Sequence, residues 1–283
     1  MSNTLYTATG CTRCKIVKDF MHRHGVDYVE KDIRADGKED FQDFYKKNRV
    51  AIIRGADGIE FPIFADGKAI RQGIAAAIAY LHSGEKLEGF FGVGTLHKEW
   101  VDGIHISAGN PKYAEDFVSV LRYLKSNNMK LQIETNGKNS GILQLVFNED
   151  LADAVIMNIL GPLNLYGQIL GEEVEMEDLI KSIALVAQFP NYKYQVTVAP
   201  LMRKDGNPPE ISYLTPEEMA EIARLIEEVT RTRQNPFFIR LFKPEETIDE
   251  GLKAIAPMSS SALLTYRTAA RAYQVLAEIA KQQ

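Results

Sequence analysis

The sequence predicts an α/β protein with two domains, and three observations support this prediction. The chain has 283 residues, about twice the length of a common single domain. Two cysteines, Cys11 and Cys14, lie where a short β-prone run changes into a helical pattern. From residue 102 onward, short apolar runs alternate with amphipathic helices, which indicates a parallel sheet with helical crossovers in an open or partial barrel.

The elements of the first domain follow in the order β-α-β-α-β-β-α. We expect strands at residues 4–6, 28–33, 61–64 and 69–70, and helices from the cysteines to Gly25, at about 39–48 and at 75–81. Asp66-Gly67 is a strong signal for a two-residue hairpin between the last two strands. A polar break begins at Ser83, so we place the first domain at residues 1–82 and a linker at 83–101.

The linker contains Gly89, Gly92 and Gly94, which have two interpretations. A glycine-rich loop can bind phosphate between a strand and a helix, but no such elements frame these residues. We therefore interpret this segment as a flexible connector.

The order of the elements, with Cys-x-x-Cys opening the first helix and Pro62 entering the third strand, resembles the glutaredoxin family over residues 1–82. The resemblance implies a thioredoxin fold in which Cys11 is the attacking thiolate and Cys14, one turn deeper, resolves the mixed disulfide. Electrostatics agrees, because the positive end of a helix dipole stabilises a thiolate at the N-terminus. Arg13 adds positive charge nearby.

The same resemblance places a substrate site beside the cysteines. It implies a cis peptide bond before Pro62, which leaves the backbone of Phe61 free to pair with an extended thiol substrate. The predicted substrate-binding residues are Thr12, Arg13, Phe61 and Pro62.

Glutathione is one thiol that glutaredoxins use, and this sequence departs from the family pattern for it. A lysine usually precedes the cysteine pair where Ala8 stands, and an acidic pair usually follows the glycine that matches Gly73, where Ile74 and Ala75 stand. A protein disulfide, or a reductant other than glutathione, fits these positions at least as well. Both kinds of substrate therefore stay open.

A Cys-x-x-Cys pair can also bind a metal ion. A structural zinc site needs two further ligands in tetrahedral geometry, and His22 and His24 lie too far along the same helix to reach the ion. We therefore predict redox chemistry and no metal in a single chain. Ligation of a metal or cluster by two copies, or an inert pair, are the alternatives.

The second domain, at residues 102–283, alternates strands and helices. We expect strands near residues 103–107, 131–135, 154–159, 194–199 and 237–241. Thr215-Pro216-Glu217-Glu218 is a capping box that fixes the start of a helix through Val229. A final helix at 262–281 carries an apolar stripe that packs on the barrel or forms a homodimer interface.

Polar and glycine-rich residues collect at the carboxyl ends of these strands, where parallel α/β folds place their sites. We predict a ligand site there, formed by Gly109, Asn110, Glu134, Asn136 and Asn158. The alternative is that these residues only form turns, since any loop from a strand to a helix needs Gly, Asn and Pro.

Residues 102–245 resemble the radical S-adenosylmethionine (SAM) enzymes that activate glycyl-radical proteins and anaerobic ribonucleotide reductases. Residues 107–111 stand where that family holds the methionine amino group, and residues 134–137 match a strand end of the family. The family's [4Fe-4S] cluster needs three cysteines, and no cysteine follows Cys14. Asn158 also stands where an aspartate is usual, and we expect five of the usual six strands. The resemblance therefore implies a catalytically inactive barrel without an iron–sulfur cluster.

Charge and apolar content limit the partners and the compartment. A formal net charge of −5 argues against nucleic acid as the main partner. The N-terminus lacks the basic start and apolar run of a signal peptide, and the longest apolar run, residues 74–81, is too short to cross a bilayer. We therefore expect a cytoplasmic protein that contacts no membrane.

Three functions are compatible with these features. The first is a thiol–disulfide oxidoreductase whose barrel recognises a protein partner or a ligand and which requires no cofactor. The second is a redox-sensing protein that binds S-adenosylmethionine or a nucleotide in the barrel. The third is an accessory protein that delivers electrons to an anaerobic radical enzyme, by analogy with the relatives of both halves.

Overall fold

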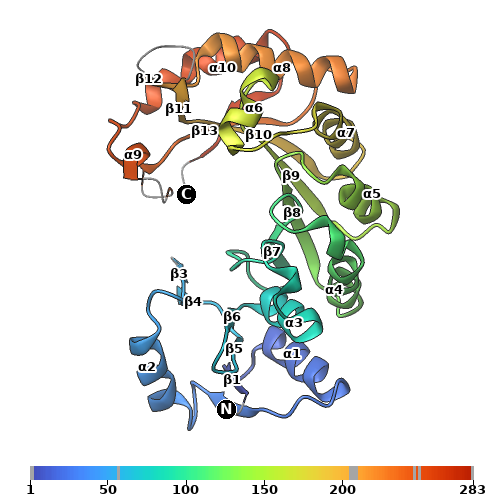
Figure 1. Cartoon of the computed structure of the whole chain (residues 1–283), viewed down its shortest axis with the longest axis vertical. Helices are drawn as coiled ribbons and strands as arrows, with labels where there is room; N and C mark the ends of the chain where they lie inside the picture. Colours follow the sequence, from blue (N-terminus) through green and yellow to red (C-terminus); the bar gives the residue numbers. More distant parts are fainter. Residues whose placement is uncertain (1–2, 56–57, 204–209, 245–246, 248–249, 282–283) are drawn as a thin grey trace. The chain divides into compact units, whose positions relative to one another are not determined.

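The computed structural model describes residues 3–55, 58–203, 210–244, 247 and 250–281. These residues fall into two compact units, and the chain passes between the units three times: inside a strand at residues 133/134, inside a helix at 144/145, and at 153/154, just before a strand. Unit 1 comprises residues 1–133 and 145–153, and unit 2 comprises residues 134–144 and 154–283. Figure 1 shows the elements of both units. In the described part of the chain, no helix is long and apolar enough to cross a bilayer.

The first part of unit 1 is a four-stranded sheet with three helices. The strands are β1 (Thr4–Thr7), β2 (Val29–Asp32), β5 (Ile63–Ala65) and β6 (Ile70–Gln72), and the helices are α1 (Thr12–Arg23), α2 (Lys38–Lys47) and α3 (Ile74–Ser83). The strand order is β2-β1-β5-β6, and β1 pairs in parallel with β2 and antiparallel with β5. A separate two-stranded sheet joins β3 (Arg54–Gly55) and β4 (Gly58–Ile59). The thioredoxin-like α/β fold predicted for this part is confirmed.

Apolar side chains from the sheet and the helices form the core of this part. Leu5 and Ile63 on the sheet and Val17 on α1 are completely buried. α3 is buried along Ile74 to Ala79, because it packs against both α1 and α4 (Ala114–Ser126). A helix that is covered on more than one side needs an apolar sequence all round, and α3 has one.

The predicted linker makes close backbone contacts with the strand that follows it. The remaining elements of unit 1 are η1 (Gly84–Leu87), β7 (Trp100–His105), η2 (Pro111–Tyr113), α4 and most of β8 (Lys130–Thr135). The backbone N–H of Gly92 donates to the carbonyl oxygen of Gly103 at 2.7 Å. Gly89 has φ +86°, and a Cβ there would lie 2.2 Å from the carbonyl oxygen of Ala108. The glycines therefore allow a close approach of two backbone segments.

Unit 2 contains the other strands of a larger sheet and the helices between them. The strands are β9 (Ala154–Ile159), β10 (Tyr192–Val198), β13 (Phe237–Leu241) and β14 (Ala277–Ile279), with the hairpin β11 (Pro200–Arg203) and β12 (Glu210–Tyr213). The helices are α6 (Leu163–Leu170), α7 (Met176–Val186), α8 (Pro216–Thr230), α9 (Glu250–Lys253) and α10 (Leu263–Arg271), and α5 (Ser140–Asn148) crosses the unit boundary. The sheet order is β14-β13-β10-β9-β8-β7, and β10 pairs in parallel with β9 and β13. This α/β architecture is consistent with the predicted partial barrel.

The predicted final helix is wrong beyond its first half. α10 ends at Arg271, and residues 277–279 form β14, which pairs in parallel with β13. Gln274, which lies between these two elements in the sequence, is completely buried. Its Nε2 donates to the carbonyl oxygen of Ala223 at 3.2 Å, and its Oε1 accepts from the backbone N–H of Asn235 at 3.3 Å. Among the described residues the sheet therefore has six strands, where we expected five.

Candidate functional site

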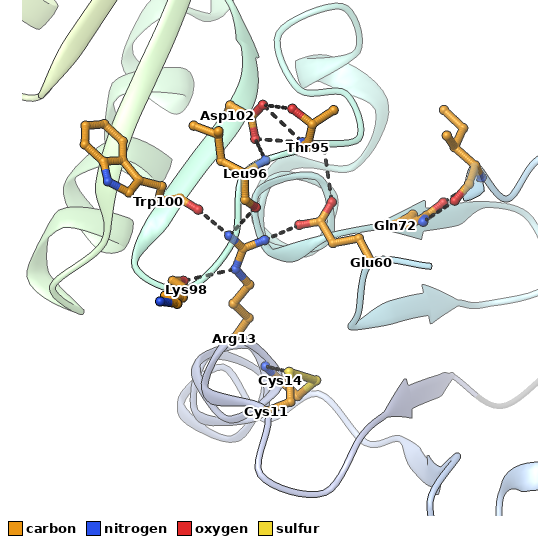
Figure 2. Close-up of polar contacts among 12 residues, drawn as sticks. Cys11, Arg13, Cys14, Glu60, Gln72, Thr95, Leu96, Lys98, Trp100 and Asp102 are labelled. Atoms are coloured by element: carbon orange, nitrogen blue, oxygen red, sulfur yellow. Dashed lines mark hydrogen bonds and ion pairs between the residues drawn. A yellow bond between two sulfur atoms is a disulfide. The ribbon is translucent and has the colours of Figure 1, made fainter. Parts of the chain in front are cut away.

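The two cysteines lie at the start of α1 and form a disulfide (Figure 2). Gly10, with φ +80°, turns the chain from β1 into the helix in a conformation that favours glycine. Cys11 is the N-cap of α1, and its Sγ accepts a hydrogen bond from the backbone N–H of Cys14 at 3.1 Å. Cys11 is partly exposed, whereas Cys14 is 2% exposed. One sulfur can thus meet a substrate while the other stays behind it.

The helix start favours a negative charge on the Cys11 sulfur. The first turn of α1, all of which is described, contains no acidic residue. The unpaired N–H groups and the positive end of the helix dipole therefore act on the N-cap sulfur without an opposing carboxylate from the helix. A thiolate formed there on reduction is stabilised, and a thiolate is the nucleophile of disulfide exchange.

The loop before β5 reaches the same end of the sheet as the cysteines. β5 runs antiparallel to β1 with Tyr6 opposite Ile63, so the residues before Ile63 lie beside the turn that follows β1. The Phe61–Pro62 peptide bond is cis, as the family resemblance implies. Thr12 is exposed on the first turn of α1. Three of the predicted substrate-binding residues, Thr12, Phe61 and Pro62, are thus brought to the end of the sheet that carries the dithiol.

Arg13, the fourth predicted substrate-binding residue, has a different environment. Its side chain is only 10% exposed. Nη1 donates to Oε1 of Glu60 at 2.6 Å, Nη2 donates to the carbonyl oxygens of Leu96 (2.7 Å) and Trp100, and Nε donates to that of Lys98 at 3.4 Å. Figure 2 shows the guanidinium between the cysteine pair and this segment. In this structure the guanidinium of Arg13 is hydrogen-bonded to groups of its own chain.

Glu60 is the ionic partner of Arg13 and is equally buried, with a side chain 11% exposed. Its Oε2 accepts a hydrogen bond from the backbone N–H of Gly94 at 3.1 Å. Burial raises the pKa of Glu60, and the Asp102 carboxylate raises it further, although Arg13 acts in the opposite direction. A Cβ on Gly73, the residue before α3, would lie 2.8 Å from Oε2 of Glu60. Glu60 therefore joins α1, the start of α3 and the segment before β7.

The sequence interpretation missed Glu60 and the segment at 94–102, although one signal for a partner was present. Arg13 lies three residues before Ile16 and seven before Phe20, both of which are buried on α1. Helical periodicity thus places a cation on the buried face of α1. A buried cation needs an anionic partner, and the partner had to come from elsewhere in the chain. Periodicity alone could not name Glu60, because the contact spans 47 residues.

Two residues of the predicted barrel site, Gly109 and Asn110, lie in unit 1 and have local roles there. A Cβ on Gly109 would lie 2.3 Å from the ring of Phe90, so the glycine lets that ring pack against the backbone. Oδ1 of Asn110 accepts from the backbone N–H of Lys112 at 3.0 Å and caps η2. A ligand role for these two residues stays a prediction.

The other three residues of the predicted barrel site lie in unit 2. Nδ2 of Asn158 donates to Glu134 at 2.9 Å, and Oδ1 of Asn158 accepts from Nε2 of Gln195 at 2.7 Å. We call the side chains of Glu134, Asn158 and Gln195 the amide row. Asn136 is not part of it: its carbonyl oxygen accepts from the hydroxyl of Tyr166 at 2.9 Å. Within the described residues, no three His, Cys, Asp or Glu side chains are placed to hold a metal ion.

Residues 3–51 match the family model of the glutaredoxins. The chain carries a glutaredoxin domain at its N-terminus. No curated protein is detectably similar to the chain in sequence. Among solved structures, the chain is similar to a domain of pyruvate-formate lyase-activating enzyme from Bacteroides vulgatus, with 11% identity and a TM-score of 0.45. That alignment covers 64% of this chain and 100% of that domain. The similarity is distant, so the radical SAM-like part rests on the sequence resemblance.

Proposed function

We propose that the chain is a thiol–disulfide oxidoreductase in which Cys11 attacks and Cys14 resolves. The observation that supports this best is the Cys11–Cys14 disulfide at the start of α1, with the partly exposed Cys11 as N-cap and Cys14 buried behind it. It occurs in a glutaredoxin domain, the family in which a Cys-x-x-Cys pair performs this exchange.

The reaction transfers two electrons from the dithiol to a substrate disulfide. The Cys11 thiolate attacks one substrate sulfur, which forms a mixed disulfide and expels the other substrate sulfur as a thiolate that takes up a proton. The Cys14 thiol then loses its proton and attacks Sγ of Cys11. This step forms the Cys11–Cys14 disulfide and releases the second substrate thiolate. An external thiol reductant reverses both steps and regenerates the dithiol.

The substrate in this proposal is a protein disulfide or a small thiol disulfide, and no cofactor is required. The backbone at Phe61 and the exposed Thr12 lie at the end of the sheet that carries Cys11, which supports their contact with the substrate. The second domain, as a catalytically inactive relative of the radical SAM enzymes, recognises the partner or a ligand. The chain does not fit a [4Fe-4S] cluster, since both of its cysteines are in the α1 disulfide.

Two measurements test the proposed chemistry. The rate of alkylation of Cys11 in the reduced protein, followed against pH, should report a thiol pKa well below the free value of ~8.5. The equilibrium with glutathione should give a reduction potential within the range of about −180 to −270 mV of related redox proteins. An unshifted pKa together with an inert pair would contradict the proposal.

Two variants then assign the roles of the sulfurs. Cys11→Ser should abolish the reduction of disulfides, because the attacking sulfur is lost. Cys14→Ser should trap the mixed disulfide, visible by mass spectrometry, or leave an activity that needs only one thiol. Equal residual activity in Cys11→Ser would show that the roles are wrongly assigned.

A second candidate function is a redox-sensing protein that binds S-adenosylmethionine or a nucleotide in the second domain. The amide row favours it, because amide and carboxylate groups side by side on adjacent strands can bind a polar ligand. Calorimetric titration of S-adenosylmethionine and of ATP tests it. Affinity that survives in the double variant Cys11→Ser/Cys14→Ser, or that shifts with the oxidation state of the pair, would support it.

A third candidate is an accessory electron donor to an anaerobic radical enzyme, and it rests on the sequence resemblance of the second domain. It requires a specific complex with a glycyl-radical enzyme or with its activating enzyme. Analytical ultracentrifugation of the purified components would detect such a complex.

A further inference from the structure

The positive charge of Arg13, the residue before Cys14, is paired with a carboxylate inside the protein. Arg13 stands between the two cysteines, and its ion pair with Glu60 has a distance of 2.6 Å between Nη1 and Oε1. The two side chains are 10% and 11% exposed. An ion pair this deep is screened little by salt, so each charge is felt by its partner much more than by solutes.

The start of α3 is a second positive feature near the dithiol, and Glu60 also faces it. Gly73 is the N-cap of α3 with φ +88° and has no side chain with which to cap the helix. The carboxylate of Glu60 occupies the space beside Gly73. A Cβ built on Gly73 would lie only 2.8 Å from Oε2 and 3.0 Å from Oε1 of Glu60. An anion is favoured at the N-terminus of a helix, and here the chain supplies that anion itself.

We propose that Glu60 is a specificity-determining residue, because it is the built-in counter-anion of Arg13 and of the start of α3. It makes this dithiol exchange poorly with small thiols that carry carboxylates, such as glutathione, and favours thiols that carry none. The proposal deepens the oxidoreductase function proposed above and rests on it. Glu60 thus faces both of these positive features, the guanidinium of Arg13 and the start of α3.

The test compares glutathione with glutathione diethyl ester as reductants of the Cys11–Cys14 disulfide. The two probes share one thiol and differ in two carboxylates. The measured quantity is the ratio of their second-order rate constants, glutathione over ester, at one pH and low salt. Comparing this ratio between variants cancels the intrinsic difference in reactivity of the two thiols.

Glu60→Gln removes the negative charge and keeps the size of the side chain. The buried charge of Arg13 is then unpaired, so the ratio should rise about tenfold over wild type. Arg13→Gln must not raise the ratio, and the double variant Arg13→Gln/Glu60→Gln, which is neutral again, should return to within about twofold of wild type. A merely structural role of Glu60 predicts no such restoration.

Glu149→Gln is the matched control, because Glu149 also pairs with an arginine, with 2.6 Å between its Oε2 and Nε of Arg122 on α4. It should leave the ratio unchanged. A second measurement needs no variant: in the wild type, the ratio should change less than about twofold between low and high salt, because the charges of Arg13 and Glu60 cancel each other.

The outcomes separate the two proposals. If neither glutathione, its ester nor dithiothreitol reduces the disulfide, the oxidoreductase function fails. If all three reduce it but Glu60→Gln leaves the ratio at the wild-type value, or the wild-type ratio falls steeply with salt, Glu60 does not determine specificity and the oxidoreductase function stands.

Discussion

Two polar clusters, one in each unit, differ in what they can do. The Arg13–Glu60 pair in unit 1 is a buried ion pair, and Arg13 lies between the two cysteines of the disulfide in the sequence. The amide row in unit 2 contains one carboxylate, Glu134, linked through Asn158 to Gln195, with no thiol or hydroxyl nucleophile in the hydrogen-bonded chain that the structure describes. The two clusters therefore differ in chemistry, because the first adjoins a disulfide and the second contains only amide and carboxylate groups.

The largest expected difference comes from replacing Cys11, next to the first cluster, and Glu134, in the second cluster. Cys11→Ser should lower the rate of disulfide reduction by on the order of 1,000-fold, because a hydroxyl cannot replace the thiolate as nucleophile. Glu134→Gln should change it by less than about twofold. The measurement is the steady-state reduction of a small disulfide. A comparable loss in both variants would remove the distinction between the two clusters.

The second test concerns stability. Arg13→Gln leaves the carboxylate of Glu60 buried without a cation and leaves three backbone carbonyls without their donor, so the free energy of unfolding should fall by about 3 kcal/mol. Arg122→Gln breaks two ion pairs on the surface, with Glu115 and Glu149, and should cost less than about 1 kcal/mol. Urea denaturation of both variants measures the difference. A loss near that of Arg122→Gln would show that the buried pair contributes little.

In unit 2 the expected effect is smaller. Asn158→Ala removes the amide that links Glu134 with Gln195, and the free energy of unfolding should fall by about 1 kcal/mol, since the two side-chain hydrogen bonds of Asn158 are lost. Disulfide reduction should stay at the wild-type rate. If this variant slows thiol exchange, the amide row acts on the dithiol after all.

The smallest expected effect is a pH dependence. Burial raises the pKa of Glu60 in the folded state above the ordinary value of 4.5. The folded protein therefore holds this proton to higher pH than the unfolded chain, so the contribution of Glu60 to stability falls as pH rises from about 4.5 through the raised pKa. Glu60→Gln should show a flatter stability profile in this window, measured by urea denaturation between about pH 4 and 7. Parallel profiles would contradict the raised pKa.

Much of the fold could be predicted because its signals are local. The cysteines at a strand-to-helix junction and Asp66-Gly67 in a hairpin place the elements of the first domain. In the second domain, Thr215 and Glu218 form the predicted capping box, with the backbone N–H of Thr215 donating to Oε2 of Glu218 at 2.8 Å. Each of these patterns depends on neighbours within a few residues, and such patterns are legible in a single sequence.

What could not be predicted depends on contacts between distant segments. The end of α10 is set by Gln274, whose partners Ala223 and Asn235 lie 51 and 39 residues away. An apolar stripe with helical spacing fits a strand equally well when it is only three residues long, as in β14. The inward direction of Arg13 was missed for the same reason, since its acceptors belong to residues 60 and 96–100.

The backbone contact between Arg13 and Trp100 has an optical consequence. Trp100 is the single tryptophan of the chain, its carbonyl oxygen accepts a hydrogen bond from Arg13, and Nζ of Lys130 lies 5.7 Å from the centre of its ring. Indole fluorescence responds to nearby charge and to solvent. The protein therefore carries its own emission probe beside Arg13, one of the two residues that separate its cysteines, and we expect stopped-flow spectra of unlabelled material to follow the oxidation and reduction of the pair in real time.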